Sequence, residues 1–240
     1  MNNPIHERLQ QVKKRIAEAA AHYSRITNSI QLLAVSKTRP AEDILEAYAT
    51  GQLCFGESYL QEALEKIEQL SGKGIEWHFI GRIQSNKTRA IAENFDWVHS
   101  LGTLKHARRL NDQRPAGLAP LNVCLQINID AEESKAGTSE AEAAELVAKI
   151  DTLPRLRLRG LMALPAPSER SDLQRRPFRA LRQMRDRLAT SDSPLETLSM
   201  GMSSDLEAAI AEGATIIRVG TDIFGPRTPL KNSNHEVEKP

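Results

Sequence analysis

Short apolar runs and amphipathic segments alternate along almost the whole chain. The apolar runs, rich in Val, Ile and Leu, are typical of buried strands. These eight runs span residues 31–36, 53–56, 76–81, 96–101, 122–129, 156–164, 197–201 and 215–220. Between them, segments such as "AEDILEAYAT" repeat apolar residues at three- and four-residue spacing, which predicts helices. The pattern therefore predicts strands alternating with helices.

This alternation is typical of parallel strands joined by right-handed helical crossovers. Eight such units in 240 residues match the length of a (β/α)8 barrel, so we predict an α/β fold, a single-domain TIM barrel over residues 1–227. An amphipathic segment near 5–23 predicts an extra helix before the first strand, and the polar stretch 228–240 predicts a flexible tail. An open doubly wound sheet is the alternative, but no G-x-G-x-x-G follows the first strand.

The charge balance argues against several classes of partner. Lys and Arg total 32 against 31 acidic residues, and a net charge of +1 gives no long-range attraction to nucleic acid or to an anionic membrane. Seven arginines within 170–187 suggest an RNA-binding patch, but Leu181, Met184 and Leu188 form an apolar helical stripe there. We interpret that stretch as a loop and a solvated helix face, and we predict small-molecule partners.

The location of the protein follows from what the chain carries. It opens without an apolar signal core, and no window approaches about 18 consecutive apolar residues, so we predict neither secretion nor a membrane span. Cys54 and Cys124 lie in strand-like runs, where cysteine behaves as a small core hydrophobe. These features predict a cytoplasmic protein. No His or Cys cluster has metal-site spacing, so we predict no metal.

A lysine stands at the end of the first strand, just before a predicted helix whose N-terminus disfavours a cation. Leu33, Val35 and Lys37 share the inward face of this strand, which places Lys37 at the carboxyl-terminal mouth, where this fold carries its active sites. Thr38 is the candidate cap of the following helix. Lys37 is either a solvated lysine paired with an acidic residue of that helix, or a Schiff-base nucleophile activated by desolvation and a neighbouring cation.

Two loops that carry glycines and hydroxyls follow the seventh and eighth strands, at the recurring phosphate site of this barrel. Glycine lets a backbone approach an anion closely, and hydroxyl groups donate hydrogen bonds to it. The candidate phosphate residues are Gly201, Ser203, Ser204, Gly220 and Thr221. Ser204 and Glu207 also form a capping-box pattern, which by itself indicates only the start of a helix.

An arginine interrupts the apolar eighth strand, "TIIRVG". Beside a packed core, Arg218 must either pair with a nearby carboxylate or hold a ligand, because an unpaired buried cation is unfavourable. A lysine at strand one, an arginine in strand eight and phosphate loops after strands seven and eight together suit pyridoxal phosphate (PLP).

Seven longer motifs occur in order: "LLAVSKTRP", "CFGESYLQEA", "WHFIGRIQSNK", "VCLQINIDAEESKAG", "LRGLMALPAP", "LSMGMSSDLEAAI" and "RVGTDIFGPR". Over roughly residues 5–227 the chain resembles the pyridoxal phosphate homeostasis protein family, which is similar to the N-terminal barrel of alanine racemases but lacks their second domain. The resemblance implies that Lys37 is the Schiff-base lysine and that Arg218 faces the pyridine nitrogen. It also implies that Ser203, Gly220 and Thr221 lie in the phosphate-binding segments.

Three further residues of these motifs, Ser58, Lys135 and His78, are also candidates for the site. Ser58 stands where the family commonly has Asn, in "GENY", so no contact is assigned to it. Lys135, in the family pattern after strand five, is the rival nucleophile, although an acidic, polar loop is a poor place to lower the pKa of a lysine. His78 is interpreted as a core histidine without a catalytic role, and the resemblance places its strand near the cofactor ring.

The expected chemistry is binding without turnover. An arginine at the pyridine nitrogen disfavours protonation there and weakens the ring as an electron sink. Two-base racemisation needs a second proton carrier, and Tyr23, Tyr48 and Tyr59 all fall in predicted helices. The resemblance therefore implies a non-catalytic protein that holds PLP as a lysine aldimine and acts in vitamin B6 homeostasis. We expect a monomer whose partners are PLP-dependent apoenzymes; a weak PLP-dependent amino-acid racemase is the alternative.

Overall fold

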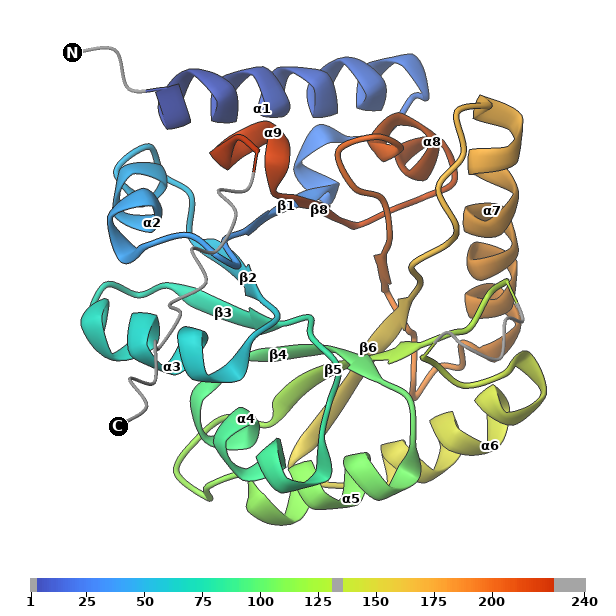
Figure 1. Cartoon of the computed structure of the whole chain (residues 1–240). Coiled ribbons are helices and arrows are strands. Elements are labelled where there is room, and N and C mark those ends of the chain that lie inside the picture. Colours follow the sequence, from blue (N-terminus) through green and yellow to red (C-terminus); the bar gives the residue numbers. More distant parts are fainter. Residues whose placement is uncertain (1–3, 131–135, 227–240) are drawn as a thin grey trace, which may run out of the picture.

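In the computed structural model, which describes residues 4–130 and 136–226, eight parallel strands close into a barrel (Figure 1). Each strand pairs with the next along the chain, and β8 pairs with β1 to complete the ring. The strands are β1 Gln31–Val35, β2 Cys54–Glu57, β3 Glu76–Phe79, β4 Trp97–Leu101, β5 Leu121–Gln126, β6 Leu156–Met162, β7 Thr197–Ser199 and β8 Ile216–Val219. The predicted barrel is confirmed, and the doubly wound sheet is wrong.

Helices surround the barrel, and most lie where the periodicity predicted them. They are α1 Pro4–His22, α2 Ala41–Tyr48, α3 Leu60–Gln69, α4 Thr88–Asn94, α5 Leu104–Gln113, α6 Glu140–Asp151, α7 Ser171–Leu188, α8 Leu206–Ala211 and α9 Thr221–Phe224, with 3-10 turns η1 Thr27–Ser29 and η2 Ser85–Lys87. Helix α7 begins before the predicted segment and continues through Pro177. The predicted apolar stripe of this helix is buried at Leu181 and Met184.

Two apolar cores stabilise the fold. The larger one fills the space between the outer face of the strands and the helices. The smaller one comprises Leu33, Trp97, Cys124, Met162 and Ile216. These five residues come from β1, β4, β5, β6 and β8, and side chains of such distant strands can meet only inside the barrel. The interior is therefore a packed core.

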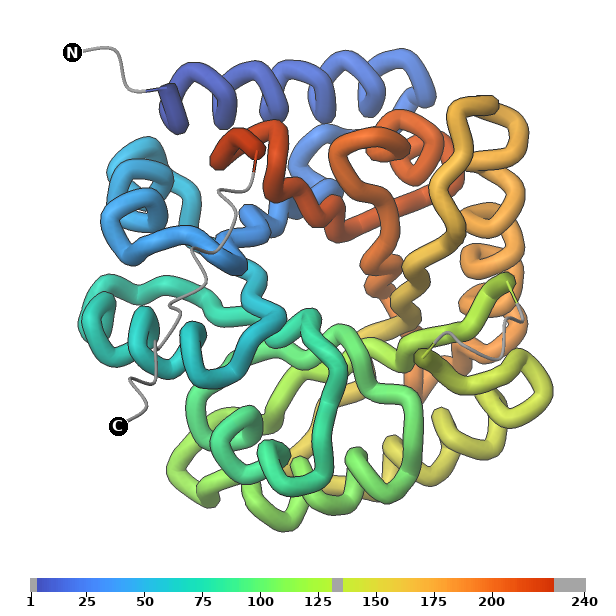
Figure 2. Tube along the Cα trace, in the orientation of Figure 1, coloured from blue at the N-terminus to red at the C-terminus, as the bar shows by residue number. Residues whose placement is uncertain are grey.

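Helix α1 lies beside α8 and α9, so the first and last described elements of the chain are neighbours (Figure 2). No helix within residues 4–130 or 136–226 combines the length and the apolar character needed to cross a membrane. Two predictions, the flexible tail at 228–240 and the rival nucleophile Lys135, lie outside the described residues.

Candidate functional site

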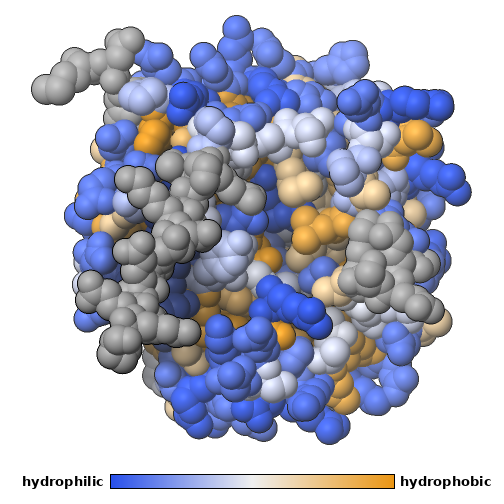
Figure 3. Space-filling model, viewed as in Figure 1, coloured by the Kyte–Doolittle hydropathy of each residue, from blue (hydrophilic) through white to orange (hydrophobic). Residues whose placement is uncertain are grey.

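A cavity of about 460 Å³ opens beyond the carboxyl-terminal ends of the strands, a volume typical of small-molecule sites. Figure 3 shows hydrophilic and hydrophobic residues meeting around the hollow centre of the face seen in Figure 1. The cavity is lined by all five residues that the sequence analysis assigned to cofactor binding: Lys37, Ser203, Arg218, Gly220 and Thr221. Val35 also lines it, as expected from the alternation along β1.

Lys37 follows the end of β1 and lies next to a buried ion pair. Lys66 of α3 contacts Glu57 of β2 at 2.8 Å between Nζ and Oε1, and their side chains are 5% and 0% exposed. The same Lys66 Nζ donates to the Ser36 carbonyl at 2.9 Å, and the Ser36 hydroxyl donates to Glu57 at 2.7 Å. The residue before Lys37 is therefore fixed to the barrel by a buried polar network, in which Glu57 Oε1 is hydrogen-bonded and Oε2 has no partner among the described residues.

The residue after Lys37 departs from the sequence prediction. Thr38 does not cap α2: the residue directly before this helix is Pro40, and it forms no side-chain cap. Thr38 has a φ of +63°, and its backbone N–H donates to Glu62 Oε1 at 2.6 Å. A positive φ is strained for a β-branched residue, so surrounding contacts must hold this loop in place. The tertiary contact with Glu62 replaces the expected local cap.

Arg218 lies in the cavity wall and is 4% exposed. Its Nη1 donates to the Ser199 hydroxyl at 2.7 Å, and its Nη2 donates to the Ala163 carbonyl at 3.0 Å. Neither acceptor is a carboxylate, so these bonds are not the ion pair of the purely structural interpretation. Burial lowers the pKa of Arg218 to about 10, an effect that Asp205 partly opposes, and the guanidinium stays a cation at neutral pH.

The glycines of the two loops serve different purposes. Gly220 directly precedes α9 and approaches β1 so closely that a Cβ would lie 3.1 Å from the Val35 carbonyl oxygen. Gly201, also expected near the anion, is not among the residues that line the cavity. It has a φ of +91°, and a Cβ there would lie 2.5 Å from the Ala209 Cβ, so close packing against α8 requires glycine.

The predicted capping box of Ser204 and Glu207 is wrong. The residue directly before α8 is Asp205, which makes no side-chain cap and instead accepts a hydrogen bond from Met202 N–H at 2.6 Å. Glu207 pairs with an arginine of α1. Ser204 still lines the cavity beside Ser203, so the loop presents two hydroxyl-bearing residues to a ligand.

Arg15, which the sequence analysis missed, contacts both loops from outside the barrel. Its Nε donates to Glu207 Oε1 at 3.0 Å, its Nη1 to Asp222 Oδ2 at 2.6 Å, and its Nη2 to the Ser203 carbonyl at 3.0 Å. Ser203 follows β7 and Asp222 follows β8, so a single guanidinium joins the two loops. In the sequence Arg15 is one of several charged residues of an amphipathic helix, and nothing nearby indicates these partners.

The tyrosines do not contribute to the cavity. Tyr48 lies in α2, whereas Tyr23 directly follows α1 and Tyr59 directly precedes α3, so two of the three were wrongly predicted to be helical. None of them belongs to the described lining. Ser58, to which no contact was assigned, does line the cavity.

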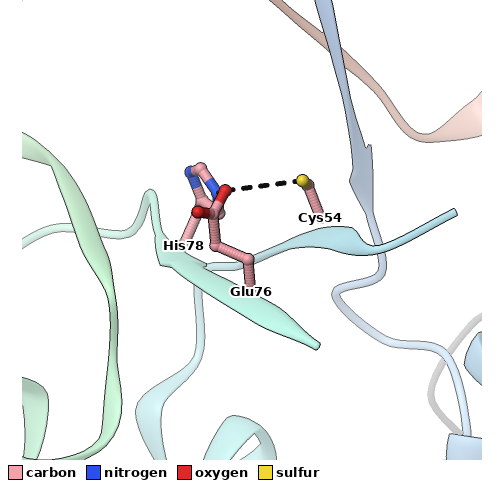
Figure 4. A group of neighbouring side chains, drawn as sticks. All are labelled: Cys54, Glu76 and His78. Carbon is pink, nitrogen blue, oxygen red and sulfur yellow. Dashed lines mark hydrogen bonds and ion pairs between the residues drawn. The ribbon is translucent and has the colours of Figure 1, made fainter. Parts of the chain in front are cut away.

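A second cluster of reactive side chains lies in β2 and β3 and consists of Cys54, Glu76 and His78 (Figure 4). Their potential ligand atoms lie within 4.8 Å of one another, which makes them the one candidate metal group found in residues 4–130 and 136–226. Their spacing matches no metal motif; pairing of Cys54 with Glu76 across the strands brings them together. His78 is fully buried, as expected of a core histidine, and does not line the cavity.

Comparison with known proteins gives consistent matches along the chain. Residues 8–228 match the family described as alanine racemase, N-terminal domain. The pyridoxal phosphate homeostasis protein of Pseudomonas aeruginosa is 53% identical over 223 residues, covering 93% of this chain and 96% of the relative. That of Escherichia coli K12 is 52% identical over 231 residues, covering 94% and 97%. The structure of PipY from Synechococcus elongatus PCC7942 with PLP bound is 36% identical, with a TM-score of 0.81, covering 92% of this chain and 100% of PipY.

Replacing Arg15 by Met keeps most of the side-chain length but removes every donor that holds the two loops. We expect faster amide hydrogen exchange in both 202–204 and 220–222, because each loop loses a contact that restrains it. Exchange measured by mass spectrometry on the purified variant checks this. Wild-type exchange at 220–222 would show that the contact with Asp222 does not restrain that loop.

Arg25→Met is the matched control for this experiment. Arg25 donates to the Ile210 and Ala214 carbonyls at 3.2 and 2.6 Å, at the far end of α8. Faster exchange in this variant should stay near those two residues and should not reach 220–222.

Proposed function

Because the chain belongs to the pyridoxal phosphate homeostasis protein family, we propose that its cavity binds pyridoxal 5'-phosphate and that the protein acts in intracellular vitamin B6 homeostasis. The observation that carries this proposal is the convergence of Lys37, Arg218 and the two hydroxyl-bearing loops on one cavity of suitable size. PipY, 36% identical over most of the chain, has been solved with PLP bound.

The phosphate end of the ligand would lie between the loops after β7 and β8. Ser203 and Thr221 can donate hydroxyl hydrogen bonds to a dianion, and Gly220 has no side chain to keep it away. Arg15 joins both loops behind these residues, so the recognition groups are held at a fixed separation before any ligand arrives. This arrangement is the reason we expect phosphate to contribute binding energy independently of Lys37.

The aldehyde end would lie against Lys37. Bound pyridoxal phosphate supplies a reactive aldehyde, and the amine of Lys37 would condense with it to form a C=N bond and release water. The loop that carries Lys37 is anchored on one side by Lys66 and on the other by Glu62, which restrains the amine for this reaction. Lys37 would therefore hold the cofactor reversibly, as a Schiff base.

Arg218 would contact the pyridine nitrogen, and its charge is the reason we propose binding without turnover. A cation opposite this nitrogen disfavours its protonation, so the ring withdraws few electrons from a bound amino acid. A weak amino-acid racemase is the alternative, favoured by the match of residues 8–228 to the alanine racemase N-terminal domain. Chiral analysis after incubation of the holoprotein with single amino-acid enantiomers should detect no interconversion; turnover abolished by Lys37→Ala would establish the racemase.

We further propose that the protein works in the cytoplasm as a monomer and supplies PLP to PLP-dependent apoenzymes. Cys54 and Cys124 are both free thiols, which suits a reducing compartment. A cofactor that is held by a reversible covalent bond and by hydrogen bonds to its phosphate can dissociate chemically unchanged. Delivery to another protein requires this.

Borohydride reduction should place a phosphopyridoxyl group on the peptide that contains Lys37, because reduction makes the C=N bond permanent. Lys37→Ala should still bind pyridoxal phosphate through the phosphate loops but should take up no label. Peptide mass mapping of both proteins checks this, with Lys135→Ala as the control that keeps the label. A label found on Lys135 of the wild type would contradict the assignment.

Ser203→Ala combined with Thr221→Val should reduce the preference for the phosphorylated ligand. Each hydrogen bond to a dianion is worth about 1.5 to 3 kcal/mol, so losing two should weaken pyridoxal phosphate binding at least about tenfold. Unphosphorylated pyridoxal is the control ligand, and its affinity should change little. Titration of both ligands into both proteins checks this, with circular dichroism confirming the fold. An unchanged preference would place the phosphate site elsewhere.

A further inference from the structure

Four hydrogen bonds in series cross the interior of the barrel and end at Arg218. Starting from β3, Glu76 Oε1 lies 2.8 Å from His78 Nε2, and His78 Nδ1 lies 2.8 Å from His99 Nε2 of β4. His99 Nδ1 lies 2.7 Å from the Ser199 hydroxyl of β7, which accepts from Arg218 Nη1 of β8 at 2.7 Å. We name these five residues the interior chain.

The three middle members of the interior chain are closed to water, whereas its ends, Glu76 and Arg218, reach the two mouths of the barrel. His78, His99 and Ser199 are 0% exposed, whereas the Glu76 side chain is 39% exposed. Glu76 is the first residue of β3, so it lies toward the amino-terminal mouth, opposite the cavity. The ring of Trp97 stacks on His78 at 5.4 Å with an interplanar angle of 5°, which fixes the plane of that imidazole. The chain thus joins the two mouths of the barrel.

The direction of the hydrogen bonds in the interior chain follows from the Glu76 carboxylate, which accepts, and from two neutral imidazoles. Arg218 can only donate, so the Ser199 oxygen accepts from it and keeps its own proton, which it is able to donate to His99 Nδ1. Burial lowers the pKa of both histidines, so each imidazole is neutral and carries a single N–H. That proton must lie on Nε2 in both rings, since His99 then donates to His78 and His78 donates to Glu76.

The opposite direction would leave groups unsatisfied. The hydrogen bond from His78 holds the pKa of Glu76 at about 2, so Glu76 is a carboxylate that can only accept. With protons on Nδ1 of both rings, a lone pair on His78 Nε2 would face a carboxylate lone pair at 2.8 Å. The arrangement with both protons on Nε2 is therefore the one in which each donor meets an acceptor.

In this polarity the polar groups of Cys54, Glu76 and His78 are hydrogen-bonded to one another without a metal ion. A metal would need the lone pair of His78 Nε2, which the chain assigns to an N–H that donates to Glu76. Burial and the neighbouring Glu76 raise the pKa of Cys54 to about 12, so Cys54 is a thiol in the metal-free protein. The Cys54 thiol instead donates to Glu76 Oε1 at 3.4 Å (Figure 4).

We propose that His78 and His99 are positioning residues, which hold the Arg218 guanidinium through Ser199 and link its charge to the Glu76 carboxylate at the opposite mouth. Arg218 thereby keeps a fixed orientation in the cavity wall through hydrogen bonds to a hydroxyl and a carbonyl rather than to a carboxylate. A change of charge at the amino-terminal mouth changes the polarisation of the interior chain. It thereby changes the electrostatic potential that the Arg218 cation presents to the ligand. The effect on a bound cofactor rests on the function proposed above, whereas the interior chain of hydrogen bonds does not.

Nitrogen-15 NMR of the imidazole side chains in the ligand-free wild type tests the chain without any substitution. Both histidines should be neutral, with the proton on Nε2 and a bare Nδ1. A proton on Nδ1 of either ring, or a charged ring at neutral pH, would overturn the proposal. Because no cofactor is present, this outcome is independent of whether the cavity binds PLP.

Glu76→Gln tests the link between the two mouths, because the amide oxygen can still accept from His78 while the charge is lost. The side-chain NMR signals of His99 and Arg218 should shift, and the absorption spectrum of bound PLP should shift with them. Glu93→Gln is the matched control. The Glu93 side chain is 40% exposed and pairs with Arg89, and neither residue belongs to the interior chain, so the His99 and Arg218 signals should not shift.

Ser199→Ala distinguishes transmission along the interior chain from a through-space electrostatic effect, because it removes the hydroxyl that links His99 to Arg218. In this background, Glu76→Gln should no longer shift the Arg218 signal. An equal shift in both backgrounds, or none in the wild-type background, would overturn the proposal. If the wild type shows the expected NMR signals but binds no PLP, the proposed function is refuted and the interior chain is still supported.

Discussion

A polar group inside a closed barrel has no access to bulk water and must find its partner on another strand. This constraint explains how an arginine can lie in the wall of the cavity and remain charged. Arg218 of β8 donates to Ser199 of β7 and to the carbonyl of Ala163, which follows β6. His99 and His78 satisfy the next groups in turn, so the interior combines apolar packing with one continuous polar path.

The cavity depends both on residues of the barrel strands and on residues of the outer helices. Strands β1 and β8 place Lys37 and Arg218 at the mouth, but the loops that carry their neighbours are held by residues of the outer helices. Lys66 of α3 fixes the backbone before Lys37, and Arg15 of α1 fixes the loops after β7 and β8. Helix α1 is therefore part of the site's support, although it contributes no residue to the described lining.

Repeating patterns made the barrel predictable, because alternation of strand and helix depends on many residues and tolerates local exceptions. The position of Lys37, Ser203, Arg218, Gly220 and Thr221 around one cavity also followed, since strand ends of this fold meet at one mouth. Local capping patterns misled at Thr38, whose N–H donates to Glu62, and at Ser204, whose expected partner Glu207 pairs with Arg15 instead. Arg15 and its partner Glu207 are 192 residues apart, and His99 and its partner Ser199 are 100 residues apart, beyond any local pattern.

The contacts of Arg15 have a consequence for the order in which the protein is completed during synthesis. Helix α1 leaves the ribosome before the loops that it holds, which follow 188 to 207 residues later. Until then Arg15 has none of these partners, and the strand that closes the barrel is missing as well. A nascent chain stalled before β8 would therefore lack both the closed barrel and the contacts that hold the two loops of the cavity.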